Sequence, residues 1–239
     1  MANHQVIPLK TIGILGGMSN VATVNYYKGI NQRVNEIVGG YNIAEIIMHS
    51  VNFANIEAFV RGNQWDDSAD YLIDKALKLE QAGADFILCV SNTMHRVAPQ
   101  IKAAINVPFL HIAEPVVEAI KSAKMHTVGL LGTLPIMETN YMRDYYIKHG
   151  INVVVPTKAD MILVDRIIFD ELVKEVVTDI SRQQYVRVAR QLEAKGAQGI
   201  ILGCTEIEML LKPDDVSGLP LFDTTALHID KAARLAVIS

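Results

Sequence analysis

Cysteine is scarce in this sequence, and its scarcity excludes several classes of protein. The 239 residues contain two Cys, and neither belongs to a Cys-x-x-Cys pair that would indicate a metal site. Two cysteines do not make a disulfide framework, and the seven His are scattered, so we expect no metal. The opening segment, MANHQVIPLK, lacks the apolar stretch of a signal peptide, and we therefore expect reduced thiols in a cytoplasmic protein.

Excess positive charge and long apolar runs are also absent. The net charge of −4 gives no basic footprint, which argues against nucleic acid as a partner. No apolar run approaches the roughly 20 residues that span a bilayer, so we expect no membrane partner. Half of the residues are hydrophobic and a fifth are charged, as in a compact enzyme whose length allows one large domain or two small lobes.

One segment of the chain occurs nearly twice. Residues 79–93 read LEQAGADFILCVSNT, and residues 192–206 read LEAKGAQGIILGCTE. When the two are aligned without a gap, Ser91 matches Cys204. Two equivalent strand ends are thus predicted to carry a small side chain with a protic O or S atom, as a site acting on both faces of one small molecule would require.

Two further echoes extend the repeat over much of the chain. TIGILG at 11–16 recurs as TVGLLG at 127–132, and NVPFLHIAE at 106–114 has a weaker echo in GLPLFDTTA at 218–226. The three echoes come in the same order, which indicates a duplicated half. The alternative is that buried α/β strands resemble one another because all are rich in Val, Ile and Leu.

Short apolar runs alternate with amphipathic stretches throughout the chain. Strands are predicted at 11–16, 45–51, 86–90, 107–112, 127–131, 153–155, 200–202 and 219–222, and helices at 21–35, 67–82, 95–104, 137–149, 160–177 and 181–195. This alternation is typical of an α/β protein with parallel sheets flanked by helices. We expect two pseudosymmetric lobes, 1–112 plus 224–239 and 113–223, with the active site in the cleft between them, beyond the carboxyl ends of the strands.

Cys204 is the first candidate for chemistry. It lies in GCTE, between a predicted strand and a predicted helix start, where backbone N–H groups and the helix dipole would lower the pKa of its thiol. The alternative role is that of a small buried apolar residue. The match to Ser91 favours the functional role.

Four motifs in order resemble the aspartate/glutamate racemase family: GILGGMS at 13–19, SNTMH at 91–95, GLLGT at 129–133 and GCTEI at 203–207. The resemblance implies two α/β lobes related by a pseudo-twofold axis, a small amino-acid substrate, and a homodimer. It also implies racemisation without pyridoxal phosphate, metal or any other cofactor. In that mechanism one thiolate removes the Cα proton, and a second thiol returns a proton on the opposite face.

The developing carbanion needs hydrogen-bond donors at the substrate carboxylate. Backbone N–H groups and hydroxyls near four residues could supply them: Asn92, Thr93, Thr133 and Thr205. For Asn92 and Thr93 the alternatives are roles in a turn or in capping a helix. Glu206 could hydrogen-bond near the site, and a capping role is equally open for it. Gly17, beside Met18, could let the backbone approach the ligand, or could simply form a tight turn. Asn52, after the second predicted strand, could also reach the substrate.

Position 91 departs from the pattern of the family, in which the residue before Asn-Thr is the first catalytic Cys. Ser91 has a hydroxyl with a far higher pKa than a thiol, so it is a poor base but can donate or relay a proton. Three explanations are open. The first is that the chain is a natural variant, like those subgroups of the family that have a hydroxyl residue at this position and whose turnover is biased towards one enantiomer. The second is that Cys was replaced by Ser through engineering. The third is that Cys89 is the catalytic thiol in place of residue 91. Because Cys89 lies two residues back, roughly 6–7 Å inside the sheet, it is expected to be a core residue.

An acidic substrate also requires a cation. Lys174 matches the position where the resemblance implies a partner for the side-chain carboxylate, although it could instead pair with Asp170 or Glu171 on the same predicted helix. Arg61 and Arg166 are weaker candidates for this cation. His49, like Asn52, could reach the cleft or have a core or turn role, and His95 could tune the thiol or cap a helix.

The sequence therefore predicts a racemase of aspartate, and also of glutamate as an open possibility, with Ser91 and Cys204 as the catalytic pair. Two alternatives remain open. The first is a one-thiol decarboxylase of the same superfamily, and the second is a dicarboxylate-binding protein that has lost catalysis.

Overall fold

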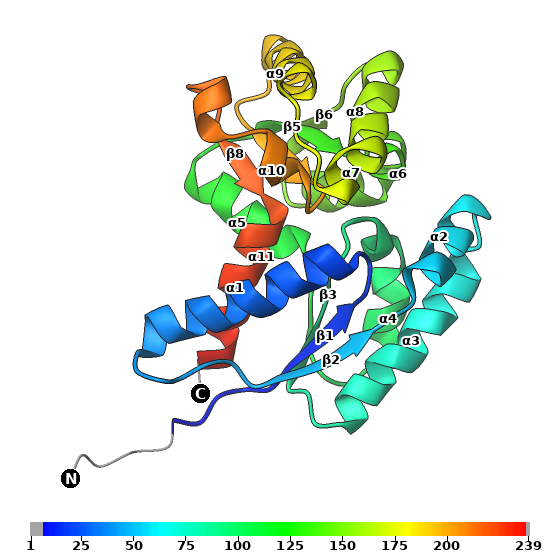
Figure 1. Ribbon diagram of the computed structural model, residues 1–239, viewed down its shortest axis with the longest axis vertical. Coiled ribbons are helices and arrows are strands. Elements are labelled where there is room, and N and C mark those ends of the chain that lie inside the picture. Colours follow the sequence, from blue (N-terminus) through cyan, green and yellow to red (C-terminus); the bar gives the residue numbers. More distant parts are fainter. Residues whose placement is uncertain (1–6, 238–239) are drawn as a thin grey trace. The chain divides into compact units, whose positions relative to one another are not determined.

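The computed structural model describes residues 7–237 of the chain. These residues form two compact units (Figure 1). The first unit contains 7–90, 97–111 and 229–237 of the described residues, and the second contains 91–96 and 112–228. This division differs from the predicted lobes by placing the short segment 91–96, residue 112 and residues 224–228 in the second unit. No helix in the described part of the chain is both long and apolar enough to cross a membrane.

The first unit is built on a parallel four-stranded sheet. Its strands are β1 (Ile12–Gly16), β2 (Ile46–Ser50), β3 (Phe86–Cys89) and β4 (Phe109–Leu110), in the order β2-β1-β3-β4. The connecting helices are α1 (Asn20–Val38), α2 (Phe53–Arg61), α3 (Trp65–Gln81) and α4 (Ala98–Ala104), with a 3-10 turn at Thr93–Val97.

The second unit repeats this plan. Its parallel strands are β5 (Thr127–Gly132), β6 (Asn152–Val154), β7 (Ile200–Gly203) and β8 (Leu221–Asp223), in the order β6-β5-β7-β8. Its helices are α5 (Ala113–Ser122), α6 (Leu134–Glu138), α7 (Asn140–Lys148), α8 (Lys158–Asp170), α9 (Asp179–Ala194) and α10 (Ile207–Leu210), with 3-10 turns at Leu172–Lys174 and Pro213–Val216. The last helix, α11 (Thr224–Val237), continues from the second unit into the first.

The register of the two sheets confirms that the echoes in the sequence reflect equivalent structures. Gly13 of β1 is the partner of Ile87 in β3, and Gly129 of β5 is the partner of Ile200 in β7, just as the aligned motifs require. At both glycines an added Cβ would come within 3 Å of the partner isoleucine side chain. The same close packing of strand and side chain is therefore repeated in each unit.

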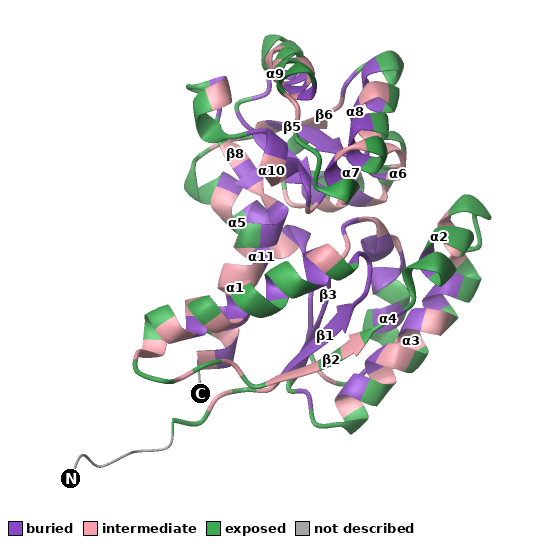
Figure 2. Cartoon of the chain, in the orientation of Figure 1, coloured by how far each residue is buried: buried purple, intermediate pink, exposed green. Residues whose placement is uncertain are grey.

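The sheet of the first unit is covered by helices on both faces. Strands β1 and β3 are buried along their whole length (Figure 2). On one face of the sheet, α1 and α11 bury an apolar stripe against Ile12, Ile14 and Leu88, and Tyr26 of α1 is fully buried. Burial of each large side chain of this kind contributes about 1.5–3 kcal/mol relative to exposure. Helix α3 packs on the other face of this sheet, and α4 lies beside α3 (Figure 1).

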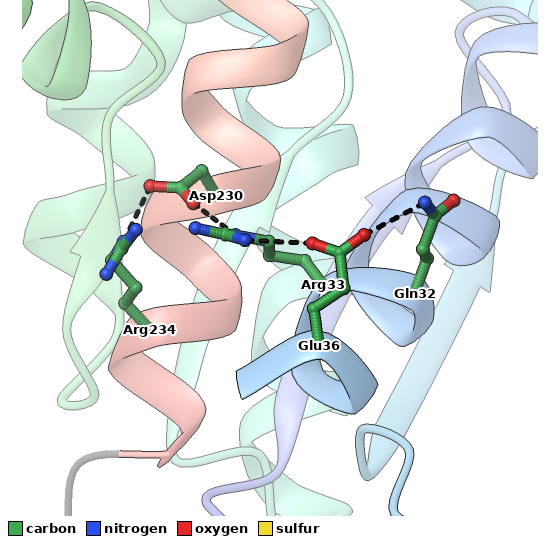
Figure 3. Close-up of polar contacts among 5 residues, drawn as sticks. All are labelled: Gln32, Arg33, Glu36, Asp230 and Arg234. Atoms are coloured by element: carbon green, nitrogen blue, oxygen red, sulfur yellow. Dashed lines mark hydrogen bonds and ion pairs between the residues drawn. The ribbon is translucent and has the colours of Figure 1, made fainter. Parts of the chain in front are cut away.

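An ionic network joins α1 to the end of α11. Arg33 of α1 donates to Asp230 of α11 at 2.5 Å and to Glu36 at 2.8 Å, and Arg234 donates to the second oxygen of Asp230 (Figure 3). Burial raises the pKa of Asp230, but the hydrogen bonds from Arg234 and Arg33 outweigh it and hold the pKa below its ordinary value. The network fixes the carboxyl-terminal helix on the first unit.

The core of the second unit also has two layers. Helices α8, α9 and α10 pack on one face of the sheet, where Leu131, Ile200 and Leu202 are buried. Helices α5 and α7 pack on the other face, against Leu130 and Ile201. Cys204 belongs to the first of these layers.

Three predicted helices differ in detail from the structure. The helix predicted at 160–177 ends at Asp170, because Glu171 leaves helical geometry and Glu175 adopts a left-handed conformation. The helix predicted at 137–149 is interrupted at Thr139, whose hydroxyl donates to the carbonyl of Pro135. The stretch predicted at 95–104 is a 3-10 turn followed by α4. Helices α2, α5 and α11 were not predicted from the sequence.

Candidate active site

Ser91 and Cys204 follow corresponding strands. Ser91 comes after β3 and Cys204 directly follows β7, and these are the strands whose residues Ile87 and Ile200 hold equivalent registers. Both residues therefore lie beyond the carboxyl end of an inner strand, where α/β sheets place their ligands. Cys89, in contrast, is fully buried within β3, as expected of a core residue.

Cys204 is held by its own loop. Its thiol donates to the Glu206 carboxylate, with 3.0 Å between Sγ and Oε2, and the Thr205 hydroxyl donates to the same oxygen at 2.7 Å. Cys204 and Glu206 are only 8% and 7% exposed. Three predicted site residues thus form one hydrogen-bonded group at the end of β7.

The expected lowering of the Cys204 pKa is not observed. Burial raises the pKa of the thiol well above its ordinary value, and the charge of Glu206 and the hydrogen bond to it raise it further, as does Asp165. The helix that follows, α10, has only four residues and begins after Glu206 itself, so its dipole contributes little. In the free protein Cys204 is therefore a protonated thiol.

Ser91 begins a tight turn. Its Oγ accepts a hydrogen bond from the amide of Met94 at 3.3 Å, and its carbonyl accepts one from Nδ1 of His95 at 2.7 Å. The other ring nitrogen of His95 accepts the amide of Ile112 at 3.0 Å, so the ring carries its proton on Nδ1. Burial lowers the pKa of His95 to about 4, against the opposing effect of the Ser91 carbonyl. His95 thus acts as a neutral anchor for the backbone of Ser91.

The side chains of Asn92 and Thr93 contact two different segments of the second unit. The Asn92 side-chain amide donates to the Thr224 hydroxyl at 3.0 Å, and Thr224 in turn donates to the carbonyl of Leu202 in β7 at 2.8 Å. The hydroxyl of Thr93 lies 3.2 Å from that of Thr133. The structure therefore brings together Thr93 and Thr133, and it ties the Ser91 turn to the strand that precedes Cys204.

Thr133 is free to use its hydroxyl in this way because another side chain caps α6. Asp165 of α8 accepts the amide of Leu134 at 2.6 Å, and burial raises the pKa of Asp165 despite this bond. The Tyr141 hydroxyl donates to the carbonyls of Asn92 and Thr93 at 3.4 and 3.2 Å, and burial raises its pKa.

Sequence reasoning missed Asp165, Tyr141 and Thr224, although all three hold the candidate site. Thr224 lies in the third echo, GLPLFDTTA, and that match to 106–114 was the one signal that could have singled it out. Asp165 lies on a helix far from the motifs in sequence, and Tyr141 lies outside the motif GLLGT, on a helix that follows it, so nothing in the pattern indicated their contacts.

Three predicted binding residues belong to the first unit and have structural roles there. Gly17 has φ +88°, and a Cβ at this position would come 2.2 Å from the carbonyl oxygen of Val51, so the turn itself requires glycine. Met18 is buried beside it. The Asn52 side chain accepts the amide of Ala54 and caps α2.

Lys174 lies in the 3-10 turn after α8, not within a helix as predicted, and its side chain is exposed. This turn lies beside α10, the helix that follows Cys204 and Glu206. Glu171, one of the predicted alternative partners of Lys174, instead accepts hydrogen bonds from Thr178 and Ser181. Within residues 7–237, Lys174 forms no ion pair.

The weaker candidates are placed as follows. Arg61 pairs with Glu57 on α2, and Arg166 is exposed on α8. Burial and the nearby charges of two lysines lower the pKa of His49. Among the described residues, no group of three His, Cys, Asp or Glu side chains is arranged to hold a metal ion.

Comparison with known proteins agrees with the fold and the motifs. The family model of the Asp/Glu/Hydantoin racemases matches residues 15–232, and the chain belongs to this family. It is 25% identical over 225 residues to the broad specificity amino-acid racemase RacX of Bacillus subtilis, which covers 90% of this chain and 93% of that protein.

Two solved structures are similar over almost their whole length. One is a protein of Yersinia pestis assigned as an Asp/Glu racemase, with 43% identity and a TM-score of 0.91 over 96% of this chain and 100% of that one. The other is an aspartate racemase homologue of Pyrococcus horikoshii, with 33% identity and a TM-score of 0.84 over 95% and 99% of the two chains. The chain is therefore an isomerase of the racemase class.

Proposed function

We propose that the protein racemises aspartate, with glutamate as the alternative substrate, by proton transfer at Cα without a cofactor, with Cys204 and Ser91 as the two groups that exchange protons with the substrate. The observation that carries this proposal is the equivalence of the two residues. Each follows an inner strand, and the two strands hold matching registers in sheets of identical order. A reaction that inverts a carbon centre needs one protic group for each face.

The two groups are chemically unequal. A thiolate at Cys204 can remove the Cα proton of one enantiomer, and the hydroxyl of Ser91 then returns a proton to the other face. In the reverse direction Ser91 must remove the proton of the opposite enantiomer, and the high pKa of a hydroxyl makes it the less effective base of the two. The hydroxyls of Thr93 and Thr133, 3.2 Å apart, and the backbone around Asn92 are suited to receive the substrate carboxylate, on which negative charge accumulates.

The proposal is tested by following optical rotation and chiral chromatography with each enantiomer of aspartate and of glutamate. The wild-type protein should convert both enantiomers of aspartate to the racemate, and Cys204→Ala should remove this activity. Folded wild-type protein that leaves both amino acids unchanged would contradict the proposal.

We further propose that Lys174 binds the side-chain carboxylate of the substrate. Its position beside α10 and the absence of an ion pair among the described residues support this role. Lys174→Met should raise the KM for aspartate about tenfold or more, as expected for loss of one charge-assisted hydrogen bond, while Arg166→Met, a change at an exposed position of α8, should leave it unaltered. Equal effects of the two variants would assign the cation elsewhere. Gly17, Met18 and Asn52 remain proposed contributors to substrate binding.

A one-thiol decarboxylase is the second candidate, and one observation favours it. The thiol of Cys204 is protonated in the free protein, and the residue at the equivalent strand end is a hydroxyl rather than a thiol. A protonated thiol is suited to deliver a proton to a carbanion left by loss of carbon dioxide. Release of carbon dioxide from a substituted malonate, without racemisation of aspartate, would establish this function; binding without either reaction would indicate a dicarboxylate-binding protein.

We also propose that the protein is a homodimer, with α1 and β2 at the interface. A groove of about 400 Å³ is lined by Thr23, Val24, Tyr27, Ile46 and Met48. Val24 is 62% and Tyr27 50% exposed, although both are apolar or aromatic. β2 ends the order of strands in its sheet and carries no Lys or Pro to discourage pairing.

A second copy of this chain is the occupant that this surface favours, because an uncharged edge strand can pair with its own copy without repulsion. Light scattering after gel filtration should give twice the chain mass for the wild type and the chain mass for Val24→Lys. A wild-type protein that is monomeric at micromolar concentration would contradict the homodimer.

A further inference from the structure

We propose that the Glu206 carboxylate binds the α-ammonium group of the substrate and gives up the Cys204 thiol when it does so. The inference rests on the proposed function, because it takes Cys204 as the group that reacts with Cα. It assigns a specific recognition role to Glu206.

Distance is the first argument. A sulfur that removes the Cα proton approaches Cα to about 3–3.5 Å. The ammonium nitrogen is bonded directly to that carbon, so it lies within a few ångströms of the same sulfur. Glu206 Oε2 is 3.0 Å from Cys204 Sγ. A substrate placed for reaction with Cys204 can therefore have its ammonium group within hydrogen-bonding reach of this carboxylate when the group lies on the Glu206 side of the sulfur.

Charge is the second argument. Two carboxylates act electrostatically on Cys204 and oppose its ionisation: Glu206 on its own loop and Asp165 on α8. The Cys204 charge in turn acts on the buried hydroxyl of Tyr185 on α9. Of the three charged groups of aspartate, two are carboxylates that Glu206 and Asp165 repel, and only the ammonium group is attracted.

The hydrogen bonds of the free protein give the third argument. Glu206 is nearly fully buried. Its Oε2 atom accepts from the Cys204 thiol and from the Thr205 hydroxyl, and both of these donors are uncharged. A charged N–H donor makes a bond to a carboxylate that is roughly twice as strong as a neutral one. An ammonium group can therefore replace the thiol as the donor to this oxygen.

The exchange has a chemical consequence. With the carboxylate neutralised by the ammonium group, the Cys204 S–H bond breaks and its proton leaves to solvent, so that the thiolate forms only when substrate is bound. The thiolate then takes the Cα proton, and the electron pair of the Cα–H bond passes towards the substrate carboxylate. Ser91 delivers its hydroxyl proton to the opposite face and regains one from solvent, to which the proton from the thiol was released.

The test compares ligands with and without the ammonium group. Cys204 is alkylated with iodoacetamide at pH 8 and identified by peptide mass spectrometry, and the concentrations of aspartate and of succinate that halve the alkylation rate are measured. This readout requires no turnover, so it separates failure of the inference from failure of the racemase assignment, which the racemisation assay tests in parallel.

Glu206→Gln keeps the size and hydrogen-bonding capacity of the side chain but removes its charge. In the wild type, aspartate should protect at a concentration about tenfold or more below that for succinate, and in Glu206→Gln the two concentrations should converge. The free variant should also be alkylated faster than the wild type, because the carboxylate that opposes ionisation of the thiol is gone. Glu208→Gln, on the neighbouring helix α10, is the matched control and should resemble the wild type.

Two results would overturn the inference. One is a wild-type protein that succinate protects as well as aspartate does. The other is a Glu206→Gln variant that keeps the wild-type preference for aspartate. If Glu206→Gln does not fold, Glu206→Asp replaces it, and this variant should retain the preference at reduced affinity because the charge remains; loss of the preference there would equally refute the role.

Discussion

Acid should weaken the protein specifically through His95. This fully buried ring donates from Nδ1 to the carbonyl of Ser91 and accepts the amide of Ile112 at Nε2. Protonation would place a charge in the core and would remove the acceptor for Ile112. Burial accordingly lowers the pKa from 6.5 to about 4.

The sign and size of the effect follow from this pKa. Between pH 6.5 and 4 the unfolded chain binds a proton at this position and the folded chain does not, so stability falls as the pH falls through that window. The gap of about 2.5 pH units corresponds to about 3 kcal/mol at 1.36 kcal/mol per unit, of which about 2 kcal/mol is lost by pH 5.

The assay is urea unfolding followed by circular dichroism at pH 7.5 and pH 5.0. The wild type should lose about 2 kcal/mol more than His95→Gln between the two pH values, because Gln cannot be protonated. His126→Gln, which alters an exposed ring, should keep the wild-type loss. If the His95→Gln variant loses as much stability as the wild type over this interval, then the neutral, buried anchor inferred for His95 is wrong.

Three further changes test other parts of the structure. Ser91→Cys should increase the rate of aspartate racemisation at least tenfold in the chromatographic assay, since a thiol is a far stronger acid than a hydroxyl; an unchanged rate would exclude Ser91 from the reaction. Thr224→Val should lower the free energy of unfolding by about 1–3 kcal/mol, because it leaves the Asn92 amide without its acceptor. Gly17→Ala should destabilise the protein more than Gly83→Ala in thermal unfolding. Both glycines have positive φ, but only at the first would a Cβ meet a backbone carbonyl oxygen, at 2.2 Å, whereas the second faces open space.

The fold could be predicted largely from the internal repeat. The echoes aligned the inner strands of two sheets, and the register of Gly13 with Ile87 and of Gly129 with Ile200 confirms that alignment. Helix ends were less predictable. Glu171 leaves the helix while its side chain accepts hydrogen bonds from Thr178 and Ser181, and these partners lie seven and ten residues away.

Residues for a candidate site could be proposed from the sequence, but its electrostatics could not. The repeat singled out Ser91 and Cys204, and the motifs carried Thr93, Thr133 and Glu206. The expected low pKa of Cys204 was wrong. A helix start was expected to lower it, but burial raises it and so does Glu206, whose carboxylate accepts a hydrogen bond from the thiol. Contacts of this kind depend on side-chain direction within a loop, which the pattern of the sequence does not encode.

Exchange of the Cα hydrogen in D2O, measured by NMR on each enantiomer of aspartate separately, tests the central claim most directly. Racemisation has an equilibrium constant of one, so the inequality of the two proton-transfer groups cannot appear in the overall position of equilibrium. It should appear in exchange: the enantiomer whose Cα–H faces Cys204 should incorporate deuterium faster than it inverts, and the other should incorporate it no faster than it inverts. Equal exchange-to-inversion ratios for the two enantiomers, or exchange that survives Cys204→Ala, would contradict the account.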